Sequence, residues 1–415
     1  MIKTQTILDA QLQKLLAKHP ALKDLVVKTA ADYPDSHPVN DYDWLAAFID
    51  KCWRATYHAK NGPKKSRFIY TPNYLKWLLD TPAIDKRLTT VISDKAGQIL
   101  GITYGMNKTL NLGGENLKVV VQTGISVHPE HTKKGIAQLV YLSCHAFAIE
   151  TGYDGTIGWF DAQNNEKGHT LNIFRRTDPF LEVDVGSFFA KIFDYKKAVA
   201  VNKFNFLQKT FLKLVSGVPQ AGNRGGFKTE LIATSDNLDE IAAFINSGAR
   251  CDLQDAQSPG HYHYTKAELT RLLLYQSPTH SKENPALKTT ATLLTDNHGT
   301  IQGLLHGYNI PVEEKSTGNI FFIDNILTTK TIPTKAKTDF IKNSLAIIAK
   351  EQDVYGALVV DNTCSLKSLT YRLFSPVLSQ DLLPKKQLLV RGILSYTENF
   401  DKALDAVEKI YVDHK

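Results

Sequence analysis

The chain has 415 residues, of which 43% are hydrophobic and 22% are charged. This composition is typical of globular proteins and excludes a disordered tail, a collagen-like fibre and a coiled-coil rod. Because one core rarely grows beyond about 250–300 residues, the length predicts two or more domains. An excess of 49 basic over 42 acidic residues gives a net charge of +7, which suits a small anionic ligand at least as well as nucleic acid.

The four cysteines lie far apart and form no CxxC pair: Cys52, Cys144, Cys251 and Cys364. This spacing predicts free thiols rather than a zinc ribbon or a disulfide framework. Residues 1–25 lack the apolar run of a signal peptide, and no stretch approaches the roughly 20 apolar residues of a membrane helix. We therefore expect a cytoplasmic protein without a membrane span. The thirteen histidines show no HxxxH ligand pair on a helix, so we expect no metal site.

In chain order, a helix is predicted at about residues 6–30, and a hairpin pattern follows that occurs twice. Residues 89–107 read TTVISDKAGQILGITYGMN, and residues 289–309 read TTATLLTDNHGTIQGLLHGYN. In each copy two apolar runs flank a polar turn, which is typical of a β-hairpin. Residues 70–79 similarly match 264–273, and the segment after residue 125 matches the one after residue 326. This order predicts two similar α+β domains; convergent hairpins in unrelated domains are the alternative.

The predicted division places the first domain at residues 1–180 and the second at residues 227–415. Residues 181–226 are predicted to be a packed linker, because apolar residues recur at helical spacing over 188–215. The glycine-rich run at 217–226 marks the boundary with the second domain.

Residues 118–160 predict a strand, a basic turn, a helix and a second strand. Residues 118–127 are apolar and β-branched, and the apolar residues of 135–150 recur at helical spacing. The first N–H groups of a helix have no intrahelical partners, so such a turn can bind a pyrophosphate. Gly135 and Ala137 are small enough to let a ligand approach, and Lys133 and Lys134 add positive charge.

The stretch VHPEHTKKGIAQLV, residues 127–140, resembles the acyl-CoA-binding motif of the GNAT superfamily of N-acetyltransferases. That motif has Gln or Arg, two residues, Gly, one residue, and then Gly or Ala. Gly135 and Ala137 occupy its small positions, and Thr132 stands at the Gln/Arg position. YTPNYLKWLL, residues 70–79, looks like the aromatic-rich helix that precedes the sheet in that superfamily. Residues 67–82 and 127–140 are also similar, more weakly, to stretches of N-myristoyltransferase, although residues 411–415 are unlike that family's ending.

The resemblance implies an α+β (α/β layered) fold with two tandem GNAT-like acyl-CoA N-acyltransferase domains, each a twisted mixed sheet flanked by helices. It implies that acetyl-CoA or another acyl-CoA binds where two strands splay apart. The cofactor-binding residues that it implies are Ile125, Ser126, Val127, Thr132, Lys133, Lys134, Gly135, Ile136, Ala137, Asn165 (or Asn164) and Phe174. Phe174 stands where many relatives carry the tyrosine that protonates the leaving thiolate, so the general acid is unassigned.

The general base is also unassigned. Gln122 and Thr123 are candidates because of their position late on the strand, although neither is basic. Asp161 and His128 are titratable and near the expected cleft, and each also suits a surface or capping role.

In the second domain the corresponding turn, residues 328–338, carries Ala336 in place of the glycine, Thr338 in place of the alanine, and Pro333 in the middle of the turn. We expect this copy to bind CoA poorly; a different loop geometry is the alternative.

The predicted function is a CoA-dependent N-acyltransferase, foremost an N-acetyltransferase, acting on an amine of a small molecule or protein near the domain interface. The alternative is a catalytically inactive GNAT-fold module that binds CoA or a protein. Nucleic-acid binding rests on net charge alone and is not favoured.

Overall fold

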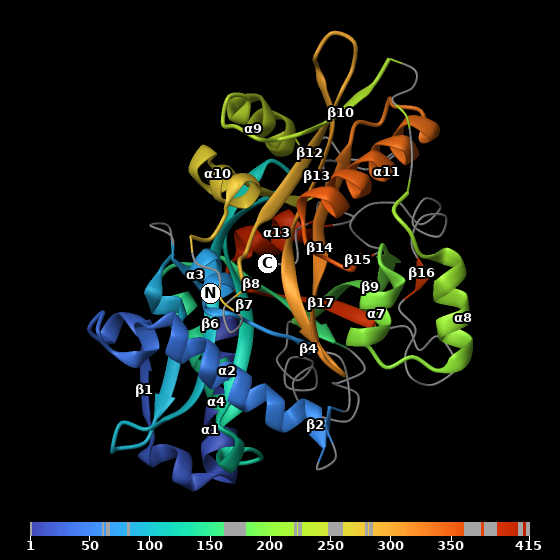
Figure 1. Cartoon of the computed structure of the whole chain (residues 1–415). Coiled ribbons are helices and arrows are strands. Elements are labelled where there is room, and N and C mark those ends of the chain that lie inside the picture. The colour runs from blue at the N-terminus through green and yellow to red at the C-terminus, as the bar shows by residue number, and fades with distance from the viewer. Residues whose placement is uncertain are drawn as a thin grey trace.

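Two mixed sheets, one in each half of the chain, join into one 16-stranded sheet that helices flank (Figure 1). The computed structural model describes residues 2–59, 62–63, 67–80, 84–161, 180–219, 222, 226–247, 260–278, 281, 285–360, 375–376, 388–405 and 410–411. The predicted helix at 167–176, with Asn164, Asn165 and Phe174, lies outside these residues, as do Cys251 and Cys364. Cys52 and Cys144 are buried, and neither forms a disulfide bond with another described residue.

The first half begins with helix α1 and ends at strand β9. Its elements are α1 (Ile2–Lys18), β1 (Val26–Thr29), α2 (Tyr42–Tyr57), β2 (His58–Ala59), β3 (Gly62–Pro63), β4 (Arg67–Phe68), α3 (Pro72–Leu79), β5 (Thr90–Ser93), β6 (Ile99–Leu112), β7 (Glu115–Val127), α4 (Ile136–Glu150), β8 (Gly155–Asp161) and β9 (Phe180–Ile192).

Two short helices lead into the second half, which repeats the element order of the first. These elements are α7 (Tyr195–Val201), α8 (Phe206–Val215), β10 (Lys228–Leu231), α9 (Leu238–Asn246), β11 (Gly260–His263), α10 (Lys266–Leu274), β12 (Thr289–Thr295), β13 (Ile301–Glu313), β14 (Thr317–Thr328), α11 (Thr334–Glu351), β15 (Gly356–Val360), β16 (Ser375–Pro376), β17 (Leu388–Ser395), α13 (Glu398–Asp405) and β18 (Ile410–Tyr411). No helix among the described residues is long and apolar enough to cross a membrane.

The two predicted hairpins form with the same turn chemistry. The Asp94 carboxylate accepts hydrogen bonds from the N–H groups of residues 96 and 98, and the Asp296 carboxylate does the same for residues 298 and 300. Gly97 and Gly299 both have a positive φ, of 86° and 78°, which glycine adopts without strain. The hairpin prediction is therefore confirmed in both halves.

The structure differs from the prediction at the N-terminus and in the segment 181–226. The predicted helix at 6–30 ends at Lys18, because Pro20 begins a separate 3-10 turn and β1 follows it. Within 181–226, residues up to Ile192 are strand β9 rather than helix. The division at residues 180 and 226 stays a prediction.

Strands β9 and β17 cross between the two halves. The strand order through the centre is β7-β8-β17-β9-β15-β14, so β17 from the C-terminal part of the chain lies beside β8 of the first half. β9 in turn pairs with β15 of the second half. A ladder that would otherwise end at β8 is thus completed by residues more than 220 positions away.

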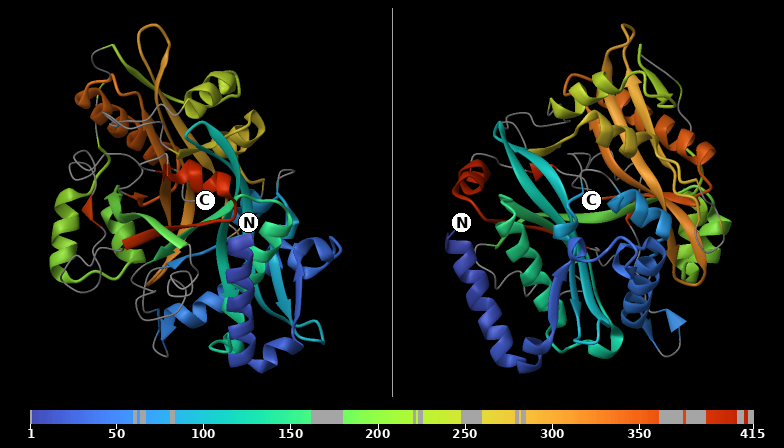
Figure 2. Two further views of the ribbon diagram at one scale, coloured as in Figure 1. Left: turned by 180° about the vertical axis from the view of Figure 1, so that it is seen from behind. Right: turned by 90° about the vertical axis from the view of Figure 1, so that its left-hand side faces the viewer.

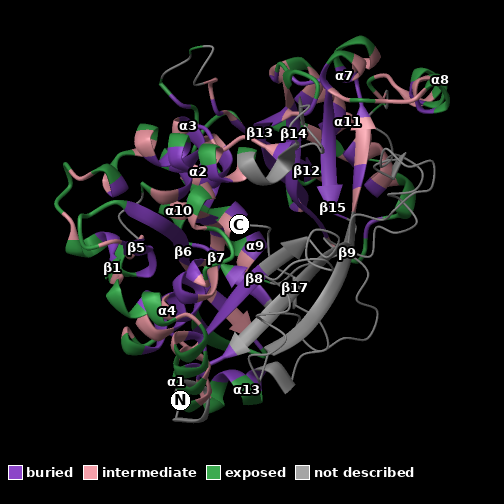
Figure 3. Cartoon of the chain, turned by 90° about the horizontal axis from the view of Figure 1, so that it is seen from below, coloured by how far each residue is buried: buried purple, intermediate pink, exposed green. Residues whose placement is uncertain are grey.

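A second, reciprocal pairing occurs at the other side of the interface. β4 of the first half pairs with β13 of the second, with Phe68 opposite Val312. β11 of the second half pairs with β6 of the first, with Tyr262 opposite Leu110. Phe68 and Tyr262 are 194 positions apart, and Leu110 and Val312 are 202 positions apart. Because the repeated sequence segments are separated by the same distances, the two pairings are equivalent in the two halves. The largest buried cluster accordingly contains residues of both halves, and strands of both halves are largely buried (Figure 3).

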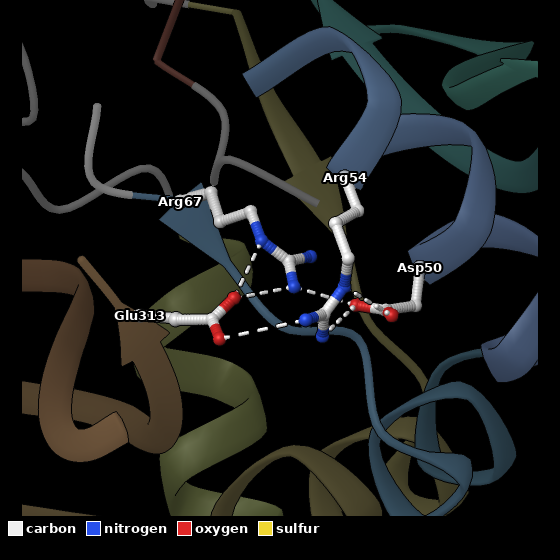
Figure 4. A network of polar contacts seen from close by, with 4 residues as sticks. All are labelled: Asp50, Arg54, Arg67 and Glu313. Carbon is white, nitrogen blue, oxygen red and sulfur yellow. Dashed lines mark hydrogen bonds and ion pairs between the residues drawn. The ribbon is translucent and has the colours of Figure 1, made fainter. Parts of the chain in front are cut away.

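Four charged side chains connect the halves where β4 meets β13 (Figure 4). The Arg67 guanidinium lies 2.6 Å from carboxylate oxygens of both Asp50 and Glu313, and its side chain is only 2% exposed. Arg54, whose side chain is 49% exposed, lies 3.1 Å from Asp50. Burial raises the pKa of Asp50, but hydrogen bonds from Arg54 and Arg67 outweigh it and hold that pKa below its usual value.

Replacing Arg67 should therefore cost far more stability than replacing Arg54. Arg67→Met removes the buried cation and leaves the two carboxylates with only the half-exposed Arg54 beside them, and we expect a loss of about 3–5 kcal/mol. Arg54→Met, the matched control, should cost less than about 1 kcal/mol. Urea unfolding of the two variants measures the difference, and equal losses would contradict a special role for the buried arginine.

The segment after β17 packs on the first half through Tyr396. The Tyr396 hydroxyl donates to Thr156 Oγ1 at 2.8 Å and contacts Nδ1 of His145, a fully buried residue of α4. Burial lowers the pKa of His145 to about 3, so the imidazole is neutral in the folded protein. Because an unfolded histidine titrates near 6.5, stability is complete above that pH and falls as the pH drops toward 3.

We expect the unfolding free energy to fall by about 1.4 kcal/mol per pH unit from this one site between pH 6 and pH 4. His145→Asn keeps an N–H donor near the Nδ1 position but cannot be protonated. The unfolding free energy of this variant should therefore fall less steeply with falling pH, by about 1.4 kcal/mol per pH unit. Urea unfolding from pH 8 to pH 4 tests this. The exposed residue His263, replaced by Asn, is the control, and equal slopes for wild type and H145N would refute the assignment.

Candidate functional site

The candidate site begins at a β-bulge near the end of β7. Ile102 of β6 lies opposite Ser126, but Tyr104 lies opposite Thr123, so two β7 residues, Gly124 and Ile125, oppose the single residue Thr103. Gly124 has φ 69°, and a Cβ there would lie 2.0 Å from the Tyr104 ring. Only glycine therefore fits this position.

The two strands of the predicted cleft separate at this bulge. In the described chain, β7 pairs in parallel with β8 from Val119–Gly155 to Gln122–Gly158 and no further. Beyond that point β8 pairs with β17 on its other side, as far as Asp161. The last five residues of β7, which include Ile125, Ser126 and Val127, thus continue without β8 as a neighbour.

The loop after β7 contains two residues in the left-handed conformation. Lys133 has a left-handed conformation with φ 64°, which is the one positive φ of a non-glycine residue in the described chain, and Gly135 follows with φ 84°. Alternation of right- and left-handed residues turns successive N–H groups toward one point and makes an anion-binding nest. Thr132, Lys133 and Lys134 are exposed, and α4 begins at Ile136, as predicted.

Gly135 also has a structural role that the sequence did not indicate. A Cβ on Gly135 would lie 3.0 Å from His19 and 3.1 Å from both Leu15 and Leu22, all in the N-terminal segment that packs beside α4 (Figure 2, right). Its positive φ independently favours glycine. A bulky replacement would disturb this packing whether or not a ligand binds, so Gly135 cannot serve as a probe of ligand binding.

Helix α2 covers the bulge with two side chains that the sequence analysis missed. Trp53 Nε1 donates to the Ile125 carbonyl at 3.4 Å, and Lys51 Nζ lies 2.8 Å from Nε2 of His128. Burial and the nearby Lys51 ammonium both lower the pKa of His128. The neutral ring thus accepts at Nε2 and carries its proton at Nδ1. Only the amphipathic pattern of α2 signalled this helix, and no motif linked it to β7.

The residues His128, Glu130 and His131 have possible ligand atoms within 4.8 Å of one another. The Lys51 ammonium donates a hydrogen bond to Nε2 of His128, so the proton of the neutral ring lies on Nδ1. Neither ring nitrogen then offers a lone pair to a metal ion. The arrangement therefore suits an anion near Lys51, Lys133 and Lys134 better than a metal ion.

The structure separates the two candidates for the acceptor side. Gln122 is buried on the face of the sheet that α4 covers, where it lies beside the Cys144 thiol, whose pKa burial raises to about 12. Its amide has no hydrogen-bond partner within the described ranges. Thr123 is half-buried, and the alternation of the strand places it on the opposite face, toward α2. For Asp161 only the backbone position at the end of β8 is described.

The remaining predicted residues differ in what they can offer a ligand. The Ser126 hydroxyl is buried and donates to the Gly124 carbonyl at 3.0 Å, and Ile125 and Val127 are partly buried against the α4 core. Ile136 is buried in the same core, whereas Ala137 is half-buried. Ile136 can therefore contribute only its backbone.

The corresponding turn of the second half has a different shape. β14 ends at Thr328 and α11 begins at Thr334, so Ala336 lies within the first turn of the helix instead of before it. None of the described non-glycine residues of this turn has a positive φ. The nest of the first half has no counterpart here, which supports the expectation that this copy binds CoA poorly.

A line of aromatic rings leads from the bulge to the second half. Trp53 lies 4.9 Å from Tyr70, Tyr70 lies 4.9 Å from Tyr74, and Tyr74 lies 5.7 Å from Tyr308 of β13 (ring centroids). Beneath the bulge, the buried Tyr104 hydroxyl finds no hydrogen-bond partner in the part of the chain that the structure describes. Aromatic rings and the Tyr104 hydroxyl, which come from elements other than β7, therefore lie near the bulge.

No protein-family model matches the chain, and no curated protein matches it in sequence. In structure it is similar to crystal structures of Saccharomyces cerevisiae N-myristoyltransferase with bound myristoyl-CoA, one of which also has bound inhibitors. Three of these have TM-scores of 0.62–0.64 at 12–13% identity, and they cover 90% of this chain and 79–83% of their own. The tandem GNAT-like fold predicted from the sequence is confirmed by this similarity.

Replacing the glycine of the bulge by alanine should cost much more stability than the same replacement in the β6–β7 turn. Gly124→Ala forces both a left-handed alanine and a collision with Tyr104, and we expect it to lower the unfolding free energy by about 3 kcal/mol. Gly114→Ala, in the β6–β7 turn, has a similar φ but no neighbour within 4 Å, so about 1 kcal/mol is expected. Equal losses in urea unfolding would show that Tyr104 does not support the bulge.

Proposed function

We propose that the protein is a CoA-dependent N-acyltransferase whose acyl-CoA site lies at the end of β7. The observation that carries this proposal is the coincidence of three features at one strand end. β7 leaves β8 after Gln122, bulges at Gly124, and runs directly into the nest at Lys133 and the N-terminus of α4. An extended ligand with a thioester at one end and a pyrophosphate at the other matches this order.

Each part of the site would bind a different part of the ligand. The N–H groups of the nest and of the first turn of α4 would bind the pyrophosphate, with Lys133 and Lys134 as cations beside it. Backbone groups of Ile125, Ser126 and Val127, which have no β8 neighbour, would bind the pantetheine amides. Thr132, Ala137, Asn165 and Phe174 remain predictions from the resemblance.

The acceptor amine would approach from the α2 side of the sheet, near the domain interface. Transfer forms a bond between the amine nitrogen and the acyl carbon, breaks the carbon–sulfur bond, and moves the amine proton toward the departing thiolate. An N–H group near Ile125 would stabilise the oxyanion. Thr123 is on this side of the sheet and Gln122 is not, so Thr123 is the better candidate for positioning the acceptor.

The sequence favours an acetyl group, and a longer acyl chain is the competing choice. The structural neighbours contain myristoyl-CoA, and that observation concerns those proteins. Comparing the affinities for acetyl-CoA and myristoyl-CoA decides between the two. These ligands share the CoA part and the thioester, so a difference in affinity reports on the acyl chain alone.

The test is calorimetric binding of CoA, acetyl-CoA and myristoyl-CoA to the wild type and to a loop variant. Lys133→Asn with Lys134→Gln removes both charges while keeping a residue that tolerates the left-handed conformation. We expect about a tenfold loss of affinity for all three ligands, because two cations beside phosphates contribute roughly 0.5–1 kcal/mol each.

The matched control is Lys330→Gln with Lys335→Gln, which removes two charges from the equivalent turn of the second half. It should leave binding unchanged; a loss there would relocate the site. Thiol release with a panel of peptides and small amines then tests transfer. Tight CoA binding without release would favour the alternative of a catalytically inactive module.

A further inference from the structure

Helix α8 exposes an apolar face that the fold does not use. Phe206 and Leu214 are each 80% exposed, Leu207 is 63% exposed and Phe211 42%, whereas Leu212 packs inward. Leu207, Phe211 and Leu214 follow one another at helical spacing and therefore share a face. Of the seven large hydrophobic side chains exposed in the described chain, five lie within residues 206–218. α8 lies at the edge of the molecule (Figures 1 and 3).

The positive charge of the protein is concentrated around this helix. Residues 195–229 contain seven basic residues and no acidic residue, which leaves 42 of each in the rest of the chain. These 35 residues thus contain the whole excess of seven basic residues, of which Lys197 pairs with Asp353 and Lys228 with Glu230. Lys213, on α8 itself, is exposed, and Lys209 is half-buried one turn before it. Neither lysine forms an ion pair in the part of the chain that is described.

Exposed Phe and Leu side chains flanked by lysines are the composition of a helix that lies in a membrane interface. The apolar face enters the boundary between headgroups and acyl chains, and the lysines reach anionic headgroups beside it. The complete absence of Asp and Glu over 35 residues matters here, because one carboxylate facing an anionic surface would oppose the docking. A groove of a partner protein would take the same apolar residues but would not require that absence.

We propose that α8 docks this protein onto membrane surfaces that contain anionic lipids, with Phe206, Leu207, Phe211 and Leu214 inserted and Lys209 and Lys213 on the headgroups. This surface is separate from the acyl-CoA site and does not depend on it.

The experiment is sedimentation of the full-length protein with vesicles of phosphatidylcholine alone and of phosphatidylcholine with 30% phosphatidylserine. We expect binding at least about tenfold tighter to the anionic vesicles, falling as salt is raised. Leu207→Gln with Leu214→Gln, and separately Lys209→Glu with Lys213→Glu, should each weaken it about tenfold or more. The replaced side chains are solvent-exposed, apart from the half-buried Lys209, so the thermal unfolding midpoint should stay within a few degrees of the wild type.

The matched control is Lys14→Glu with Lys18→Glu on α1, which changes the net charge equally on another exposed helix and should bind within about twofold of the wild type. Equal loss in this control would show a general charge effect and overturn the proposal. So would wild-type protein that does not sediment with either vesicle. If L207Q/L214Q also converts a wild-type dimer to a monomer in analytical ultracentrifugation, the occupant of this face is a second copy of the chain, and the lipid assignment is wrong.

Discussion

The pairing of β17 with β8 is the interaction on which the rest of the structure depends. A strand buried at the centre of a sheet must pair its backbone groups on both edges, because an unpaired buried N–H or C=O costs about as much as a lost hydrogen bond. β8 has β7 on one side, and the partner on its other side comes from residues 388–395. The first half is therefore complete only when the C-terminal part of the chain has folded onto it.

Several features follow from the crossing of β17 and β9 between the two halves. Tyr396, immediately after β17, packs on the buried face of α4 and contacts His145, which burial keeps neutral. β9 makes the opposite crossing to β15, so the two sheets become one and their inner helices share a core. Arg67 then lies where the halves meet, buried between carboxylates of both. Its helix-side partner Asp50 precedes Lys51 and Trp53, which contact the end of β7, so the junction between the halves and the candidate site share one helix.

The candidate site is a consequence of strand geometry as much as of side chains. β8 pairs with β17 along its whole length, but its pairing with β7 ends at Gly158, and β7 bulges at Gly124, so the last residues of β7 have no β8 neighbour. Tyr104 supports the bend by filling the space that a Cβ on Gly124 would occupy. The loop then passes through the left-handed residues Lys133 and Gly135 before α4 begins at Ile136. An extended ligand could therefore bind along the end of β7, where the pairing with β8 has stopped.

The sequence by itself determined the local elements, because their signals are short-range. Two hairpins with aspartate–glycine turns, the strand–turn–helix at 118–150 and the small residues of the loop were all readable from spacing. The repeat indicated two similar α+β domains, and the resemblance of residues 127–140 implied the GNAT-like fold. Tertiary structure alone decided which side of the sheet Gln122 and Thr123 face, what Gly135 packs against, and that Lys51 and Trp53 cover the bulge. It also decided the exchange of β9 and β17. A strand's own pattern shows that it is a strand, but its partner depends on pairing across more than two hundred residues, which no local periodicity records.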